Sequence, residues 1–365
     1  GRIYDDLGEK QKALDYYNQA LPLYRAVRDR RGEAEILNNI GVVYDSLGQK
    51  PEALKYYNQS LPLGRAVGDR NGEATTLNNI GAVYDSLGQK PEALKYYNQA
   101  SPLYRALGDR RGQAVTLNNI GAVYNSLGQK SEALKYYNQA LPLYRALGDR
   151  RGEAATLNNI GLVYNSLGQP SEALKYYNQA LPLHRAVGNR SGEAMTLNNI
   201  GLVYADLRQQ SEALKYYNQA LPLTRAVGDR RGEATTLNNI GFVYADLRQQ
   251  SEALKYYNQA LPLTRAVGDR RGEATALNNI GLVYADLRQQ SEALKYYNQA
   301  LLLIRAVGNQ REEATTLRNI GLVYADLRQQ SEALKYYNQA LLLYRAVGDR
   351  RGEATTLNSI GAIGR

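Results

Sequence analysis

Apolar side chains recur at the spacing of an α-helix in two segments of the stretch from Gly32 to Asp69. The first segment, about 33–47, carries its stripe at positions i, i+3, i+4 and i+7: Leu37, Ile40, Gly41 and Tyr44. The second segment, about 51–67, carries a similar stripe: Ala53, Tyr56, Tyr57, Ser60 and Gly64. Because residues three and four apart share one face of a helix, the pattern predicts two amphipathic helices, each burying one side.

Short segments with glycine separate the predicted helices. Gly48-Gln49-Lys50 is expected to end the first helix, and Pro51 then falls in the first turn of the second, where its missing N–H removes no hydrogen bond. Gly68-Asp69-Arg70 is predicted to close the second helix. Connections this short make the two helices antiparallel neighbours, so the stretch is predicted to form a helical hairpin.

Small and aromatic residues alternate where these two helices are expected to cross. Gly41 and Ala53 would let the backbones approach, while the rings of Tyr44 and Tyr57 would fill the space beside them. Helically spaced aromatic residues are usually packing residues, so we interpret most of the 31 tyrosines as core rather than as ligand-stacking groups.

The hairpin repeats along the whole chain with a period of 40 residues. One tyrosine marks the same position in eight copies: Tyr57, Tyr97, Tyr137, Tyr177, Tyr217, Tyr257, Tyr297 and Tyr337. We predict eight complete hairpins over about 32–347, flanked by a partial unit at 1–28 and a partial first helix at 352–365. A single hairpin cannot bury its apolar stripes alone, so residues 1–365 are expected to stack into one all-α, right-handed superhelical solenoid.

Composition argues against chemistry at an active site. The chain has no cysteine, no tryptophan, one histidine and one methionine, so thiol nucleophiles, His/Cys metal sites and Ser-His-Asp triads lack their components. We predict a non-enzymatic protein with no catalytic residues, no metal and no cofactor. No stretch reaches the roughly 18 uninterrupted apolar residues that a membrane span needs, and a cytoplasmic location without membrane contact is expected.

The formal net charge of +10 makes nucleic acid the alternative partner. The charge is spread evenly, since residues 211–250 hold five basic and four acidic side chains. The basic loop positions each follow an aspartate, and pairing within the loop is expected to neutralise them: Arg110, Arg111, Arg150, Arg151, Arg230, Arg231, Arg270 and Arg271. Nucleic-acid binding is therefore the less favoured hypothesis, and a salt-dependent binding measurement would distinguish it.

The pattern Leu37-x2-Ile40-Gly41-x2-Tyr44-x3-Gly48-x4-Ala53-x3-Tyr57 resembles the tetratricopeptide repeat signature throughout the chain. Leucine holds the usual tryptophan place, and each repeat is longer than usual, as in Leu-Gly-Asn-repeat adaptors. Thr76-Leu77-Asn78-Asn79-Ile80 is similar to kinesin light chain repeats, and the whole unit resembles cyanobacterial arrays joined to CHAT protease domains. The resemblance implies a scaffold that binds an extended peptide or partner segment along a concave groove, or alternatively a sensor or regulatory array of a larger effector such as a CHAT protease.

In that family the first helix of each repeat lines the groove, which implies a row of groove residues in this chain. The row consists of Asn38, Asn78, Asn118, Asn158, Asn198, Asn238 and Asn278, with Arg318 breaking the series. An asparagine amide offers both a donor and an acceptor to an extended peptide backbone. The alternative is that these amides bond to neighbouring helices. We favour the ligand role for this first asparagine of each pair and the structural role for the second.

Two further rows are placed in the same groove. One turn onward the position becomes bulkier toward the C-terminus: Val42, Ala82, Ala122, Leu162, Leu202, Phe242, Leu282 and Leu322. Near the end of the first helix follow four carboxylates: Asp206, Asp246, Asp286 and Asp326. Such a row favours a basic or neutral ligand. The alternative interpretation is a solvated helix end with Asp206 paired to Arg208.

The ends of the chain fall within repeats. The sequence begins at Gly1-Arg2-Ile3-Tyr4 without an initiator methionine, so we expect a fragment of a longer protein. Uncapped terminal hairpins would leave Ile3 and Tyr4 at one end and Leu357 and Ile360 at the other in water. Head-to-tail self-association through these ends is therefore a further expectation.

Overall fold

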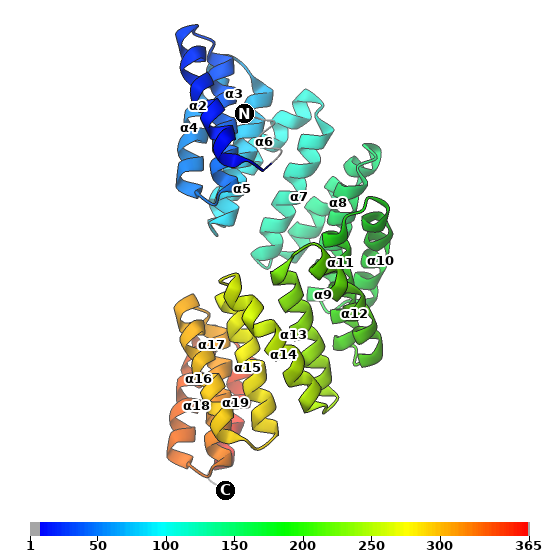
Figure 1. Ribbon diagram of the computed structural model, residues 1–365, viewed down its shortest axis with the longest axis vertical. Helices are drawn as coiled ribbons and strands as arrows, with labels where there is room; N and C mark the ends of the chain where they lie inside the picture. The colour runs from blue at the N-terminus through cyan, green and yellow to red at the C-terminus, as the bar shows by residue number, and fades with distance from the viewer. Residues whose placement is uncertain (1–7, 364–365) are drawn as a thin grey trace. The chain divides into compact units, whose positions relative to one another are not determined.

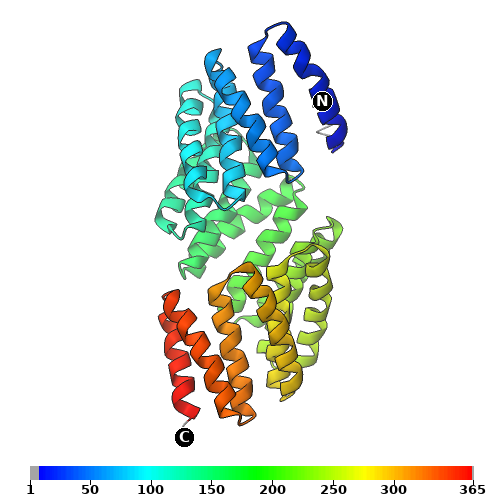
Figure 2. The same cartoon turned by 90° about the vertical axis from the view of Figure 1, so that its left-hand side faces the viewer.

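The computed structural model describes residues 8–363 of the chain. The described part consists of helices joined by short turns, and these residues fall into two compact units, Gly1–Val187 and Gly188–Arg365. Each unit is a stack of antiparallel helix pairs (Figure 1, Figure 2). The predicted all-α class and the paired-helix solenoid are confirmed within each unit, whereas the prediction of one continuous solenoid over 1–365 stays a prediction.

Residues 8–187 of the N-terminal unit form one leading helix and four hairpins. Its helices are α2 (Lys10–Ala26), α3 (Arg30–Ser46), α4 (Lys50–Ala66), α5 (Arg70–Ser86), α6 (Lys90–Leu107), α7 (Arg110–Ser126), α8 (Lys130–Ala146), α9 (Arg150–Ser166) and α10 (Pro170–Ala186). The odd-numbered helices are the first helices of the hairpins, and the even-numbered ones are the second helices. The predicted partial unit at 1–28 contributes α2, while Ile3 and Tyr4 lie outside the described residues.

The C-terminal unit repeats this arrangement with four hairpins and a closing first helix. Its helices are α11 (Arg190–Asp206), α12 (Gln210–Ala226), α13 (Arg230–Asp246), α14 (Gln250–Ala266), α15 (Arg270–Asp286), α16 (Gln290–Val307), α17 (Gln310–Asp326), α18 (Gln330–Ala346) and α19 (Arg350–Ile363). The predicted partial first helix at 352–365 corresponds to α19, on which Leu357 is exposed although its equivalents in the hairpins are buried.

Each first helix begins three residues earlier than the sequence pattern indicates. Asp69, which we expected to close the second helix, is instead the residue that caps the next first helix, because its carboxylate accepts a hydrogen bond of 3.0 Å from the Gly72 N–H. Aspartate satisfies backbone donors that a helix start would otherwise leave unpaired. The cap therefore extends the helix to Arg70, before the first apolar residue of the stripe.

One tyrosine per hairpin fills the space between its two helices. Tyr57 is 1% exposed, and a Cβ added to Gly41 would lie 2.5 Å from its ring. The other ring of the predicted pair, Tyr44, stacks on Tyr56 with centroids 5.3 Å apart and planes 10° apart. The same contacts recur along the chain, so the interpretation of Gly41 as a close crossing point and of these tyrosines as core is confirmed.

Candidate functional site

The first helices lie on the inner side of each stack. Successive first helices contact each other, as α3 does with α5 and α11 with α13, whereas within residues 8–363 successive second helices do not approach to the same extent. A stack whose first helices are closer together than its second helices is curved toward the first helices. We call the surface made by the first helices of each unit its groove face, and the three predicted rows of site residues lie on these helices.

The asparagine row connects successive first helices. In the N-terminal unit the Asn38 side-chain oxygen accepts hydrogen bonds from the Thr76 hydroxyl and from the Asn79 amide, both 3.2 Å long. The Thr116 hydroxyl bonds in the same way to Asn78 at 3.0 Å. In the C-terminal unit the Asn198 amide donates to the Thr236 hydroxyl at 2.7 Å. The structure thus shows the contact with neighbouring helices that was weighed as the alternative, and the ligand role of these amides stays a prediction.

Members of this row differ in how far they reach the surface. Asn158 is fully buried and Asn198 and Asn238 are 9% exposed, while the remaining asparagines are half-buried: Asn38, Asn78, Asn118 and Asn278. Arg318, which interrupts the series, keeps the connection between helices because its guanidinium donates to the Thr355 hydroxyl at 3.1 Å. Only the half-buried members offer polar atoms at the groove face.

The apolar row is most exposed in the C-terminal unit. Leu162 is half-buried, but the next four members are 39–51% exposed: Leu202, Phe242, Leu282 and Leu322. They come from α11, α13, α15 and α17, one from each first helix. Large apolar side chains that are repeatedly exposed on one face of a protein indicate a surface that a partner covers.

The acidic row is ion-paired from one hairpin to the next. Arg208 contacts Asp246 at 2.5 Å, Arg248 contacts Asp286 at 3.4 Å, and Arg288 contacts Asp326 at 3.0 Å. The arginine after each first helix thus reaches forward to the carboxylate of the next first helix, whereas the alternative interpretation from the sequence concerned only Asp206 and Arg208.

Asp206 stands before the first arginine of this series. Burial raises its pKa above the ordinary range, and the charge of Arg208 lowers it by a smaller amount. A carboxylate without a close cationic partner in this position is the main uncompensated negative charge of the row.

The arginines of this series adopt an unusual backbone conformation. Arg208, Arg248, Arg288 and Arg328 have φ of 59–60°, in the left-handed region that glycine occupies at the same place in the N-terminal unit. A residue with a Cβ is strained there by about 1–2 kcal/mol. The C-terminal unit thus carries guanidinium groups beside the groove face at a cost in stability.

The N-terminal unit neutralises its acids differently. Lys50 contacts Asp45 at 2.6 Å, and Lys90 contacts Asp85 at 2.6 Å, within the turn of the same hairpin. In the next hairpin the Lys130 ammonium donates to the Asn125 side-chain oxygen at 2.7 Å. The groove faces of the two units consequently differ in charge arrangement as well as in apolar exposure.

Three of the eight loop arginines that suggested nucleic acid contact an acidic side chain. Arg111 contacts Asp149 at 3.6 Å, Arg231 contacts Asp269 at 3.5 Å, and Arg271 contacts Glu312 at 2.9 Å. These pairs join neighbouring hairpins, so for these three arginines the expected pairing within one loop is wrong. Exposed ion pairs of this kind contribute little to stability, but they do reduce the positive potential along the edge.

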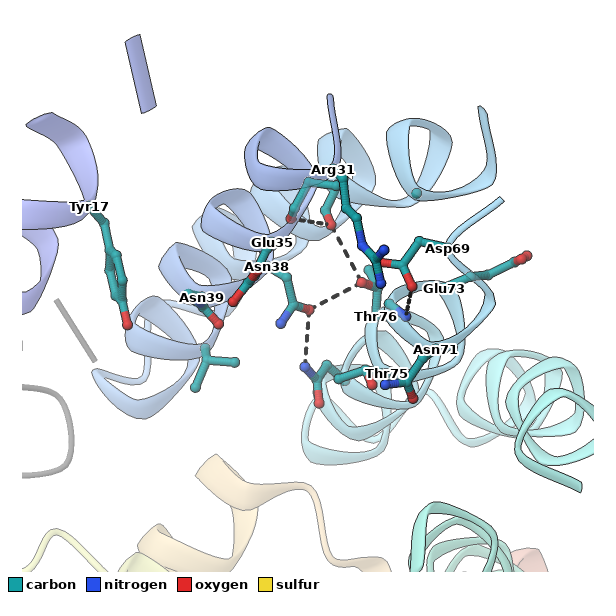
Figure 3. A pocket seen from close by; sticks show the side chains of 16 residues that line it. Tyr17, Arg31, Glu35, Asn38, Asn39, Asp69, Asn71, Glu73, Thr75 and Thr76 are labelled. Carbon is teal, nitrogen blue, oxygen red and sulfur yellow. Dashed lines mark hydrogen bonds and ion pairs between the residues drawn. The ribbon is translucent and has the colours of Figure 1, made fainter. Parts of the chain in front are cut away.

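Sequence reasoning missed a cavity of about 600 Å³ on the groove face of the N-terminal unit (Figure 3). It lies between α3, α4 and α5, and its lining includes Glu35, Ser60, Gly64 and Asn71. Each of these four residues departs from the residue found in the other copies of the repeat. These departures were the sequence feature that could have indicated the cavity. The four positions are spread along the sequence, however, and only the stacking of hairpins brings them together.

Two other properties concern cofactors and membranes. Within residues 8–363, no group of three or more His, Cys, Asp or Glu side chains is arranged to hold a metal ion. None of the described helices combines the length and the apolar character that crossing a membrane requires.

The fold and sequence are similar to those of known proteins. A family model described as tetratricopeptide repeat matches seven overlapping stretches: 1–66, 32–106, 72–146, 152–226, 192–266, 232–306 and 272–346. No curated protein sequence matches the chain. The likeness to cyanobacterial arrays with CHAT domains stays a prediction.

Three solved structures illustrate the likeness in fold. The apo form of the quorum sensor NprR from B. thuringiensis is 18% identical, with a TM-score of 0.69 over 93% of this chain and 99% of that chain. A signal transduction ATPase from Pyrococcus horikoshii with a tetratricopeptide repeat sensor is 16% identical, with a TM-score of 0.67 over 95% of this chain and 55% of that one. A Rap protein complexed with competence and sporulation factor is 13% identical, with a TM-score of 0.61 over 92% and 98%.

Proposed function

The chain belongs to the tetratricopeptide repeat family, and we propose that it is a non-enzymatic scaffold that binds an extended segment of a partner protein on its groove face. The observation that carries this proposal is the row of exposed apolar side chains at Leu202, Phe242, Leu282 and Leu322. One such side chain per first helix provides regularly spaced apolar contacts for a segment that crosses the helices. The Rap protein that holds competence and sporulation factor shares this fold and supports the same use of it.

Polar groups beside the apolar row would fix the backbone of the segment. We assign this part to the half-buried asparagines Asn38, Asn78, Asn118 and Asn278, whose amides keep hydrogen-bonding capacity beyond the contact with the next helix. The buried members, including Asn158, would act indirectly by holding the first helices in register.

Charge would contribute less to binding than the sequence alone indicates. Asp246, Asp286 and Asp326 are each beside an arginine, so their attraction for a cationic ligand is largely offset. We therefore propose that apolar contacts dominate in the C-terminal unit and that a preference for basic residues is concentrated near Asp206. The ion pairs of Arg111, Arg231 and Arg271 likewise reduce the support for nucleic-acid binding.

A displayed library of unstructured peptides, selected on the whole chain, tests the proposal. Affinities of the selected peptides are then measured by fluorescence anisotropy for the parent chain and for Leu282→Asp, which places a charge in the apolar row. We expect affinity to fall at least about tenfold, because a buried apolar contact is replaced by a desolvated carboxylate.

Leu302→Asp is the matched control, since Leu302 is 69% exposed on the second helix α16, away from the groove face. It should leave affinity unchanged, and circular dichroism should show both variants folded. An equal loss of peptide affinity in the two variants would contradict the groove as the binding surface. Unchanged affinity after Leu282→Asp would contradict it as well.

A further inference from the structure

The cavity on the N-terminal groove face coincides with a place where the repeat departs from its pattern in several positions at once. Glu35 stands where other copies have threonine, valine, alanine or methionine, and Ser60 stands where they have alanine. Gly64 replaces tyrosine, histidine, threonine or isoleucine, and Asn71 replaces arginine or serine. All four line the same space, together with Asn38 and Thr76 (Figure 3). A volume of about 600 Å³ is within the range of about 300–1,000 Å³ typical of ligand pockets.

The shape of the cavity follows from the side chain that Gly64 lacks. In the next hairpin Tyr104 occupies this position, and its ring presses against Gly112, the glycine in the first turn of the following first helix. Beside Gly64 the corresponding glycine is Gly72, and the three atoms nearest a Cβ added there all belong to its own capping residue, Asp69. An added Cβ on Gly64 would itself meet nothing closer than 3.8 Å. The space that an aromatic ring fills in the next hairpin is therefore open here.

The cavity also offers a hydrogen-bond acceptor where the hydroxyl group of such a tyrosine ring would lie. The Tyr104 hydroxyl donates to the Thr75 hydroxyl at 3.3 Å, and Tyr344 and Thr315 make the same contact at 3.0 Å. The equivalent of Thr75 one repeat earlier is Glu35, whose carboxylate has no hydrogen bond or ion pair with the described residues. A carboxylate forms a stronger hydrogen bond with a phenol O–H donor than a neutral hydroxyl group does.

The remaining polar wall is already ordered. Ser60 is 3% exposed, and its hydroxyl donates to the Ala34 carbonyl at 2.7 Å and lies 3.4 Å from the Thr76 hydroxyl. Thr76 in turn donates to Asn38 at 3.2 Å. These bonds hold the wall in place without using Glu35, so the carboxylate remains available to a ligand.

We propose that this cavity binds the hydroxyphenyl side chain of a tyrosine in the partner segment, with its ring against Gly72 and its hydroxyl donating to Glu35. The proposal rests on the groove function stated above, because it supplies one side-chain pocket to a segment that lies on the groove face. It would give the N-terminal unit a specificity that its nearly uniform repeats otherwise lack.

The first experiment uses p-cresol, the side chain of tyrosine, as the probe and needs no partner. Binding to the whole chain is followed by saturation-transfer NMR and calorimetry, with a dissociation constant on the order of 1 mM expected for so small a molecule. Gly64→Tyr should abolish binding, since it fills the cavity with the side chain that neighbouring hairpins carry there. Glu35→Thr should weaken it about tenfold through loss of the charge-assisted hydrogen bond. Toluene should bind the parent chain about as weakly as p-cresol binds Glu35→Thr.

A compensating variant protects the test against simple misfolding. Gly64→Tyr combined with Tyr104→Gly moves the cavity one hairpin along the unit, where Thr75 stands in the place of Glu35. Binding of p-cresol should therefore return with the weaker affinity expected of Glu35→Thr. Circular dichroism verifies that each variant keeps its helices. Absence of p-cresol binding to the parent chain, or undiminished binding to Gly64→Tyr, overturns the proposal.

The second experiment separates this proposal from the groove function. Peptides selected on the chain are compared with versions in which each tyrosine is replaced by phenylalanine, and both sets are measured against Gly64→Tyr. A loss of affinity for tyrosine-containing peptides supports the proposal. If peptides bind but ignore both changes, the tyrosine pocket is refuted while the groove function stands. If p-cresol binds and no peptide does, the cavity is a site for a free phenol, and the proposed partner segment is refuted together with the groove function.

Discussion

At the scale of the single residue, each hairpin depends on a tyrosine ring pressed against a glycine of its partner helix. A Cβ added to Gly81 would lie 2.8 Å from the ring of Tyr97, which is 2% exposed. We expect Gly81→Ala to lower the free energy of unfolding by about 1–3 kcal/mol, as measured by urea denaturation, because overpacking displaces a buried ring.

Gly64→Ala is the matched control for that prediction. Gly64 also lies within a helix, but the nearest atom to an added Cβ is 3.8 Å away. Alanine is the better helix former, so this variant should be unchanged or more stable by up to about 1 kcal/mol. Similar destabilisation by both substitutions would show that contact with the tyrosine ring does not set the cost of Gly81→Ala.

At the scale of the element, the turn after each first helix differs between the units. Arg248 adopts φ of 60° where Gly128 has φ of 76°, and its guanidinium reaches Asp286 at 3.4 Å while remaining exposed. The strain of about 1–2 kcal/mol exceeds the usual worth of an exposed ion pair, about 0.2–1 kcal/mol. Arg248→Gly should therefore raise the free energy of unfolding by about 0.5–1 kcal/mol in thermal or urea unfolding.

The reverse change in the other unit checks the direction of that effect. Gly128→Arg introduces the strained conformation, and we expect a loss of about 1 kcal/mol. Destabilisation by Arg248→Gly as well would mean that the ion pairs along the C-terminal unit are stronger than their exposure indicates. Stabilisation by Gly128→Arg would contradict the backbone strain assigned to arginine at this turn.

The same scale shows how far the sequence predicts the elements. Helical spacing located both helices of the repeat, and Gly48 marked a helix end with the expected left-handed backbone. Asp69 was misassigned because an aspartate between two helices is compatible with closing one or capping the other, and only its hydrogen bond to Gly72 decides between them. The forward pairing of Arg208 with Asp246 was also beyond the sequence, since it depends on how closely two hairpins stack.

The candidate site was predictable to the extent that it repeats. The apolar row from Leu202 to Leu322 recurs at a fixed interval, so a regular stack must expose its members on the same face. The cavity beside Gly64 results from a local exception, and Glu35 and Asn71 acquire a common role only when α3 and α5 lie side by side. Periodicity predicts the average repeat and leaves such departures to the three-dimensional structure.

At the scale of the whole molecule, the repeated core should make the protein sensitive to alkali. One tyrosine in each hairpin is at most 2% exposed: Tyr57, Tyr97, Tyr137, Tyr177, Tyr217, Tyr257, Tyr297 and Tyr337. Burial raises the pKa of each of them above the ordinary value of 10.0, and it raises the pKa of Tyr144 to about 12. Below pH 10 these tyrosines are protonated in both the folded and the unfolded chain, so they give no pH dependence there.

Above pH 10 the unfolded chain releases these protons while the folded chain retains them, so stability falls as pH rises, by about 1.4 kcal/mol per pH unit for each tyrosine. Because several tyrosines act together against a total stability of about 5–15 kcal/mol, we expect cooperative unfolding within about one to two pH units above 10. Far-UV circular dichroism and tyrosinate absorbance, followed together against pH, should show helix loss coinciding with ionisation of the buried class. Tyr177→Phe keeps the ring and removes the proton, so it should move this transition to higher pH. Titration of all tyrosines near their ordinary pKa in a chain that remains helical would be incompatible with rings buried between the helices.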